Sequence, residues 1–205
     1  MKVQNLQCLT DDENGAPLRF LNLWSMKFEH QGYNGMWNFA SRRGSKGRDD
    51  KPLVDGGEEK ADGVIIPARL ELPNGDSRIV VNKQFRYPLG DYEYDFPSGL
   101  FDADQTLEEL VRAELKEETG LDLKTIDLVS PPLYSSAGMT DESVVIAYVT
   151  VTGELSDKHR EPGEDIETLL LTVKEVKNLI AREHSFEGVK IAKAARPILV
   201  QMVMD

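Results

Sequence analysis

The feature that most constrains this chain is the stretch "RAELKEETGL", residues 112–121, which is expected to end a helix. On that helix Glu114, Glu117 and Glu118 stand at i, i+3 and i+4, so all three share one face. Like charges at this spacing repel each other, and the helix dipole disfavours anions at a C-terminal end. Because the cluster works against stability, we expect it to bind a cation.

The types of residue in the cluster narrow the choice of cation. Carboxylates beside a glycine-rich turn suit hard divalent ions such as Mg²⁺ or Mn²⁺. No histidine or cysteine stands near them in the sequence, which argues against zinc. The alternative is a solvated acidic helix face, which a bare ExxEE triplet would favour.

The residues before the glutamates predict the start of the same helix. Thr106 and Glu109 have the spacing of a capping box, and Gly120 stands where a C-cap glycine is expected. The apolar stripe behind the cap consists of Leu107, Val111 and Leu115.

The C-terminal part of the chain predicts two further helices. Thr172 with Glu175 caps one over residues 174–184. Another begins near Gly188 and is expected to kink at Pro197.

Most of the remaining chain predicts short strands. Asn74-Gly75 is a strong hairpin signal. The predicted strands are 18–28, 36–43, 63–72, 77–86, 91–99, 125–135, 143–153 and 166–173. Strands before and after one helix, with helices at the end, predict an α/β (α+β) fold: an α/β/α sandwich with a mixed sheet.

The composition of the chain changes along its length. Residues 1–43 hold an aromatic β-hairpin, 44–61 form a polar, glycine-rich linker, and 62–205 form the main domain. A lone hairpin is at best marginally stable in water, so this extension is expected to pack on something else.

Length, charge and cysteine content exclude several classes of protein. At 205 residues the chain has room for one well-cored domain with an extension. A formal net charge of −12 argues against general nucleic-acid binding. Cys8 is the single cysteine, which indicates a reducing compartment, and no apolar run approaches 18 residues. We therefore expect a cytoplasmic protein that does not insert into a membrane.

The stretch 99–121 resembles the Nudix box, G-x5-E-x7-R-E-U-x-E-E-x-G-U, where U is aliphatic. Seven of its nine fixed positions match: Gly99, Glu114, Leu115, Glu117, Glu118, Gly120 and Leu121. Gln105 stands where the pattern has glutamate, and Ala113 where it has arginine. The resemblance implies a Nudix fold and metal-dependent cleavage of a diphosphate.

Sequence outside the box indicates which branch of the family the chain resembles. "DGVIIP", "NKQFRYPLGDYEYDFPSGL" and the aromatic hairpin look like the ADP-ribose pyrophosphatase branch, over roughly residues 20–200. That branch cleaves ADP-ribose to AMP and ribose 5-phosphate with Mg²⁺. Its members are typically homodimers whose N-terminal strands cross onto the partner, which implies that the hairpin serves both dimerisation and contacts to the substrate base.

The resemblance also implies which residues hold metal. Glu114 and Glu118 match the main carboxylate ligands, and Glu117 matches the auxiliary ligand. We also expect Glu117 to be one of the catalytic carboxylates. Ser98 matches a residue whose backbone carbonyl binds metal. Metal ions neutralise diphosphate oxygens and lower the pKa of water, which a carboxylate base then deprotonates.

The base in this branch lies on a loop after the box, and "REPGEDIE", residues 160–167, occupies that place. Glu164 aligns best, with Glu161 as the alternative. The alternative is that residues 160–167 form only an acidic surface loop without a catalytic role.

Four residues match substrate contacts of the family. Arg86 and Arg42 match arginines that bind the diphosphate, and Trp37 and Trp24 match aromatics that sandwich adenine. The alternatives are a surface salt bridge for Arg86 and core packing of a small sheet for both tryptophans.

Three departures keep other functions open. Ala137 stands where the branch often has a proline, so GDP-mannose or another nucleoside diphosphate sugar is also a candidate substrate. Gln105 and Ala113 leave room for a nucleotide-binding module or regulator with weak chemistry, which the intact ExxEE opposes.

Overall fold

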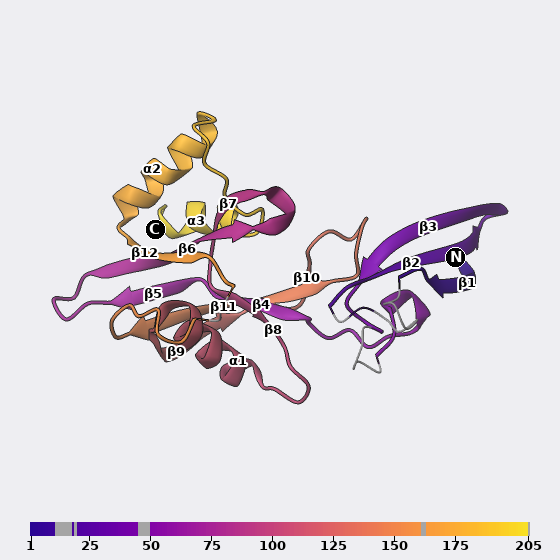
Figure 1. The fold of residues 1–205 in the computed structure, drawn as a ribbon, viewed down its shortest axis with the longest axis horizontal. Helices are drawn as coiled ribbons and strands as arrows, with labels where there is room; N and C mark the ends of the chain where they lie inside the picture. The colour runs from indigo at the N-terminus through magenta and orange to yellow at the C-terminus, as the bar shows by residue number, and fades with distance from the viewer. Residues whose placement is uncertain (11–17, 19, 45–49, 161–162, 205) are drawn as a thin grey trace. The chain divides into compact units, whose positions relative to one another are not determined.

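The computed structural model describes residues 1–10, 18, 20–44, 50–160 and 163–204 (Figure 1). The chain divides into two compact units. The N-terminal unit comprises residues 1–62 and 132–144, and the main unit comprises residues 63–131 and 145–205. Residues 132–144 lie in sequence within the predicted main domain, yet they group with the N-terminal residues.

The described residues of the N-terminal unit form an antiparallel sheet in the order β1-β2-β3. Its strands are β1 (Lys2–Cys8), β2 (Asn22–His30) and β3 (Tyr33–Ser41). The predicted hairpin is β2–β3, but its turn is only Gln31-Gly32, at φ 52° and 81°. Two left-handed residues give a tight hairpin turn whose twist matches that of the strands. Both strands therefore reach further toward the turn than predicted, whereas their other ends are shorter than the predicted 18–28 and 36–43. Strand β1 was not predicted.

The main unit is built on a mixed sheet, as predicted. β5 and β11 pair in parallel, whereas β5–β6, β6–β7, β6–β12, β9–β11 and β4–β8 pair antiparallel. The Asn74-Gly75 hairpin joins β5 to β6, with Gly75 at φ 87°. The strands are β4 (Gly63–Ile65), β5 (Ala68–Glu71), β6 (Ser77–Arg86), β7 (Asp91–Asp95), β8 (Ser98–Leu100), β9 (Asp122–Val129), β11 (Ser143–Thr152) and β12 (Ile166–Leu171). The short β10 (Leu133–Tyr134) pairs with the start of β11.

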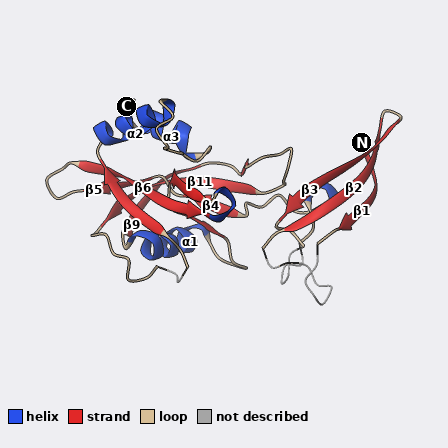
Figure 2. Cartoon of the chain, turned by 45° about the horizontal axis from the view of Figure 1, so that its top comes forward, coloured by secondary structure: helices blue, strands red, loops and turns tan. Residues whose placement is uncertain are grey.

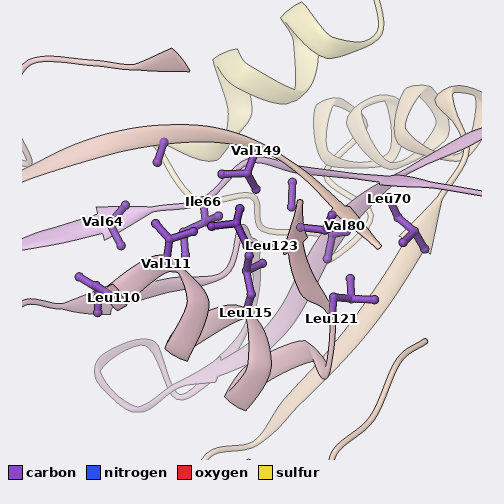
Figure 3. Close-up of a cluster of buried hydrophobic side chains, with 13 residues drawn as sticks. Val64, Ile66, Leu70, Val80, Leu110, Val111, Leu115, Leu121, Leu123 and Val149 are labelled. Atoms are coloured by element: carbon purple, nitrogen blue, oxygen red, sulfur yellow. The ribbon is translucent and has the colours of Figure 1, made fainter. Parts of the chain in front are cut away.

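Helices cover both faces of this sheet, which confirms the α/β/α sandwich (Figure 2). Helix α1 (Leu107–Glu114) lies on one face, and α2 (Val173–His184) and α3 (Ala195–Met202) lie on the other. Leu110, Val111 and Leu115 from the α1 side pack against buried strand residues such as Val64 and Val80 (Figure 3). This burial supplies the apolar driving force that fixes α1 on the sheet.

Both predicted capping boxes are confirmed, at Thr106 with Glu109 and at Thr172 with Glu175. The prediction for the last helix was wrong, because α3 begins at Ala195 rather than near Gly188. Pro197 therefore lies in the first turn, where its missing N–H has no helical partner to lose, and a proline at this position does not require a kink. Among the described residues, no helix is long and apolar enough to cross a bilayer.

Candidate functional site

The glutamate-bearing helix end is not regular α-helix. After α1 the chain continues as a π-helical turn, η3 (Leu115–Thr119), and ends at Gly120 with φ 79°. The Glu118 carbonyl accepts from Arg160 Nη2 at 3.1 Å and from Thr168 Oγ1 at 3.0 Å. Tertiary donors thus satisfy a carbonyl at the helix end, and π turns of this kind recur at functional sites.

Glu118 is the most buried carboxylate of this turn, with 4 % of its surface exposed. Asn82 Nδ2 donates to Glu118 Oε2 at 2.7 Å, and the Ser98 backbone N–H donates to the same oxygen at 3.3 Å. Burial raises the pKa of Glu118 well above its usual value, and the charges of Glu114 and Glu164 raise it further. The nearby positive charge therefore does not offset burial and the two neighbouring carboxylates, and a divalent cation would stabilise the ionised form of Glu118.

Glu114 lies against the backbone of the predicted box glycine. A Cβ placed on Gly99 would be 1.8 Å from Glu114 Oε1, so any larger residue there would displace the Glu114 carboxylate. Strand β8 carries Gly99 and pairs it with Val64 of β4. The sheet edge thus fixes the space in which the Glu114 carboxylate sits.

Glu117 is half-buried in the same turn, and its carboxylate makes no hydrogen bond or ion pair with the described residues. Nowhere in the described part of the chain do three or more His, Cys, Asp or Glu side chains form a ready-made metal cluster. The donor set still fits Mg²⁺, which commonly uses one or two carboxylates and completes its shell with water and substrate phosphate.

Arg86, at the end of β6, lies near this cluster and lowers the pKa of Glu118. Its Nη2 donates to Asp95 Oδ2 at 2.9 Å, and its Nε lies 3.6 Å from Glu93 Oε2. Burial raises the pKa of Asp95, against the opposing effect of Arg86. Arg86 therefore makes the salt bridges of the alternative interpretation, and it also lies near Glu118, as a diphosphate-binding arginine would.

The predicted base, Glu164, is half-buried on the loop before β12 and acts electrostatically on Glu118. Its neighbours are both held by tyrosines: Tyr87 Oη donates to the Gly163 carbonyl at 3.1 Å, and Tyr92 Oη donates to Asp165 Oδ2 at 2.5 Å. Glu161, the alternative base, lies outside the described residues.

The other predicted substrate contacts belong to the N-terminal unit. Trp37 is 51 % exposed and lines an apolar cavity of about 390 Å³ together with Met26, Phe28 and Phe39. Trp24 is half-buried, and its Nε1 has no hydrogen-bond partner among the described residues, which fits packing within the sheet.

Two neighbouring arginines of the same unit have different surroundings. Arg42 forms an ion pair with Glu142 and donates to the Phe20 carbonyl. Arg43 is fully buried and bonds Asp62 and the Lys60 carbonyl, a structural role that the sequence analysis missed.

The two departures from the box leave the glutamates without the family's arginine. Arg112 does not replace it, because its guanidinium bonds Glu108 and the Leu123 carbonyl. Gln105 Oε1 accepts from the Asp102 backbone N–H and helps to shape the loop before α1.

Asn82 is the main site residue that the sequence analysis missed. A signal was present, because an asparagine interrupts the apolar run "RIVVNKQFR" of a strand that was expected to be buried. Buried polar side chains need partners, and the partner here is the helix carboxylate.

Comparison with known proteins agrees with this geometry. The NUDIX domain model matches residues 68–190. "Putative nudix hydrolase 2" of Caenorhabditis elegans is 34 % identical over 147 residues, 69 % of this chain and 61 % of that protein. The ADP-ribose pyrophosphatase of Saccharomyces cerevisiae is 32 % identical over 48 % of this chain and 43 % of its own length. The Bacillus subtilis ADP-ribose pyrophosphatase is 28 % identical over 68 % and 77 %.

A solved structure, that of an ADP compounds hydrolase, has the same fold, with a TM-score of 0.61 at 12 % identity. The match covers 88 % of this chain and 82 % of the other. At this identity the likeness concerns the fold.

Proposed function

The chain belongs to the NUDIX domain family, and we propose on that premise that it hydrolyses the diphosphate of a nucleoside diphosphate sugar, ADP-ribose before others, to AMP and ribose 5-phosphate. Two of the relatives named above are ADP-ribose pyrophosphatases. The observation that carries the proposal is the buried Glu118, held by Asn82 and placed near Glu114, Glu164 and Arg86.

Proteins of this family use divalent metal ions, and we propose Mg²⁺ or Mn²⁺ at this site. Glu114 and Glu118 would hold the ion, with Glu117 and the Ser98 carbonyl as auxiliary ligands. Such an ion, when bound, neutralises diphosphate oxygens and makes water more acidic.

The side chains of the site then divide the reaction between them. Arg86 exchanges its carboxylate partners for the diphosphate and orients it. Glu164 accepts the proton of the attacking water as the new P–O bond forms and the bridging P–O bond breaks. One phosphate leaves with the nucleoside and the other with the sugar.

The N-terminal unit would supply the recognition of the base. Trp37 offers an exposed aromatic face beside a cavity for stacking on adenine, and Arg42 would contact the phosphates. We propose a homodimer in which the hairpin packs on the partner subunit, since the sheet leaves large apolar side chains such as Tyr33 and Met36 exposed. A cytoplasmic location stays a prediction from Cys8.

A second candidate, a nucleotide-binding module with weak chemistry, is favoured by Ala113 and Gln105. A panel assay separates the two. The purified chain is incubated with Mg²⁺ or Mn²⁺ and ADP-ribose, GDP-mannose or other nucleoside diphosphate sugars, and phosphate is measured after coupling to a phosphatase. Hydrolysis that EDTA and Glu118→Gln both abolish supports the enzyme. Tight nucleotide binding without hydrolysis would favour the module.

A further inference from the structure

The loop that carries Glu164 is fixed by one hairpin of the main unit. Tyr87 Oη donates to the Gly163 carbonyl at 3.1 Å, and Tyr92 Oη donates to Asp165 Oδ2 at 2.5 Å. The two hydroxyls therefore hold the residues immediately before and after Glu164. Both tyrosines belong to the β6–β7 hairpin: Tyr87 begins the short 3₁₀ turn η2 (Tyr87–Leu89) that joins the two strands, and Tyr92 lies in β7.

An aromatic cluster sets the direction of these two hydroxyls. The ring of Phe85 lies between them, with its centroid 5.5 Å from Tyr87 at 83° and 5.4 Å from Tyr92 at 76°. These edge-to-face arrangements are the favourable ones for aromatic pairs. Lys83 Nζ also lies 4.7 Å from the centroid of the Tyr92 ring. Tyr92 therefore has contacts on more than one side, which restricts the motion of its hydroxyl.

The backbone leaves Gly163 in need of such support. Its φ is 101°, a conformation that glycine adopts easily and leaves easily. On the C-terminal side, the Phe85 N–H donates to the Asp165 carbonyl at 2.9 Å, so the loop enters β12 next to the same hairpin. On the far side of the loop, Arg160 bonds the Glu118 carbonyl. Gly163 and Asp165, on either side of Glu164, are thus attached to the tyrosines, and Arg160, earlier in the chain, is attached to the glutamate turn.

We propose that Tyr87 and Tyr92, the tyrosine pair, are positioning residues that hold Glu164 where it takes the proton of the attacking water. This inference rests on the proposed function and on Glu164 as its base. Neither tyrosine touches the reacting atoms, and both act through the loop. A catalytic group displaced by about 1 Å can lose about 100-fold in rate, so two hydrogen bonds to its flanking residues matter for turnover.

The test uses steady-state kinetics of the full chain with ADP-ribose and Mg²⁺. Tyr87→Phe and Tyr92→Phe remove only the hydroxyls and keep the aromatic packing. Each change should lower kcat about tenfold, and both together about 100-fold. KM and the metal-induced rise in Tm should stay as in the wild type. Tyr148→Phe is the matched control, because the Tyr148 hydroxyl makes no hydrogen bond with the described residues.

A double-mutant cycle with Glu164→Gln separates positioning of the base from general support of the fold. In the Glu164→Gln background the tyrosine changes should have no further effect on kcat, because there is no base left to position. A further loss of the same size in that background would overturn the inference, since it would show a role independent of Glu164.

The remaining outcomes distinguish the inference from the proposed function. If the wild type hydrolyses ADP-ribose, Glu164→Gln slows it and the tyrosine variants match the wild type, the inference alone fails. If Glu164→Gln is as active as the wild type, the base lies elsewhere and the inference fails while the hydrolase stands. If the wild type hydrolyses no diphosphate, the proposed function fails first, and the inference fails with it.

Discussion

Asn82 Nδ2 lies 2.7 Å from Glu118 Oε2, so a residue in the middle of a strand fixes the carboxylate at the end of a helix. The single proton of Thr168 Oγ1 is shared between the Glu118 carbonyl, at 3.0 Å, and Asn82 Oδ1, at 2.9 Å, and the contact with Asn82 orients the amide. The three residues come from β6, η3 and β12, so the geometry of the proposed metal ligand depends on the packing of the whole main unit.

Asn82→Ala removes only a small side chain, but it should disturb the position of the Glu118 carboxylate and therefore lower kcat. The buried Glu118 carboxylate would lose its shortest hydrogen bond, which costs about 1–3 kcal/mol for a buried polar group. We expect kcat to fall roughly 10- to 100-fold through misplacement of Glu118. Kinetics and metal titration of Asn82→Ala measure this, with Asn178→Ala on the exposed face of α2 as the control. Wild-type kinetics in Asn82→Ala would show that the amide does not hold the ligand.

The raised pKa of Glu118 predicts how stability depends on pH without metal. The folded protein binds the Glu118 proton more tightly than the unfolded chain does, so the contribution of Glu118 to the free energy of unfolding is greatest below the pKa of an unfolded glutamate, about 4.3, and is lost as pH rises through the folded value. Glu118→Gln removes this loss. In EDTA at neutral pH the variant should melt at a higher temperature than the wild type.

Adding Mg²⁺ should reverse that order, because the ion stabilises the wild type by mass action and binds Glu118→Gln more weakly, since that variant has lost one of the charged ligands. Thermal melts across pH, with and without Mg²⁺, measure both effects. Glu154→Gln, at an exposed position, is the control for loss of one charge. Equal melting temperatures of wild type and Glu118→Gln under both conditions would contradict a metal site at Glu118.

Local sequence patterns predicted the elements of this site well. The capping box at Thr106 and Glu109 involves residues three apart, and Gly120 follows the helix directly, so both are visible in a short window. The two side chains that donate to the Glu118 backbone carbonyl cannot be predicted from a short window of sequence. Thr168 lies 50 residues away and Arg160 lies 42 residues away, and their positions depend on how β12 and the preceding loop pack on the sheet.

The same reason explains two other features that the sequence did not indicate. The π-helical turn depends on those distant donors, whereas the sequence pattern assumes regular helix through Thr119. Residues 132–144 group with the N-terminal unit partly because Arg42 pairs with Glu142 and the Ala40 N–H bonds the Met139 carbonyl. Contacts between segments about 100 residues apart leave no periodic trace in the sequence.

Trp37 provides the prediction for base recognition. Trp37→Ala should raise KM for an adenine substrate far more than it lowers kcat, because stacking binds the ground state and the transition state alike. Asn38→Ala is the matched control, since successive residues of a strand face opposite sides and Asn38 is exposed but not apolar. If the proposed dimer brings Trp37 to the partner's substrate, sedimentation should also show a dimer. An unchanged KM, or a monomer, would count against this role.

The last prediction concerns the two departures from the box. In the family pattern, the arginine at the position of Ala113 pairs with the box glutamates. Arg112 cannot replace it, since one residue along a helix turns a side chain by about 100°, and here it bonds Glu108 instead. Without that cation the carboxylates repel each other and are less restrained, so the natural protein should be active but slow.

Gln105→Glu together with Ala113→Arg should raise kcat with ADP-ribose, whereas neither change alone should give the full gain, because the new charges act as a pair. The four proteins of this cycle are compared at saturating Mg²⁺, so that a change in metal affinity does not mimic a change in kcat. Additive single effects would refute the pairing, and no hydrolysis by any of the four, despite tight nucleotide binding, would favour the binding module over the enzyme.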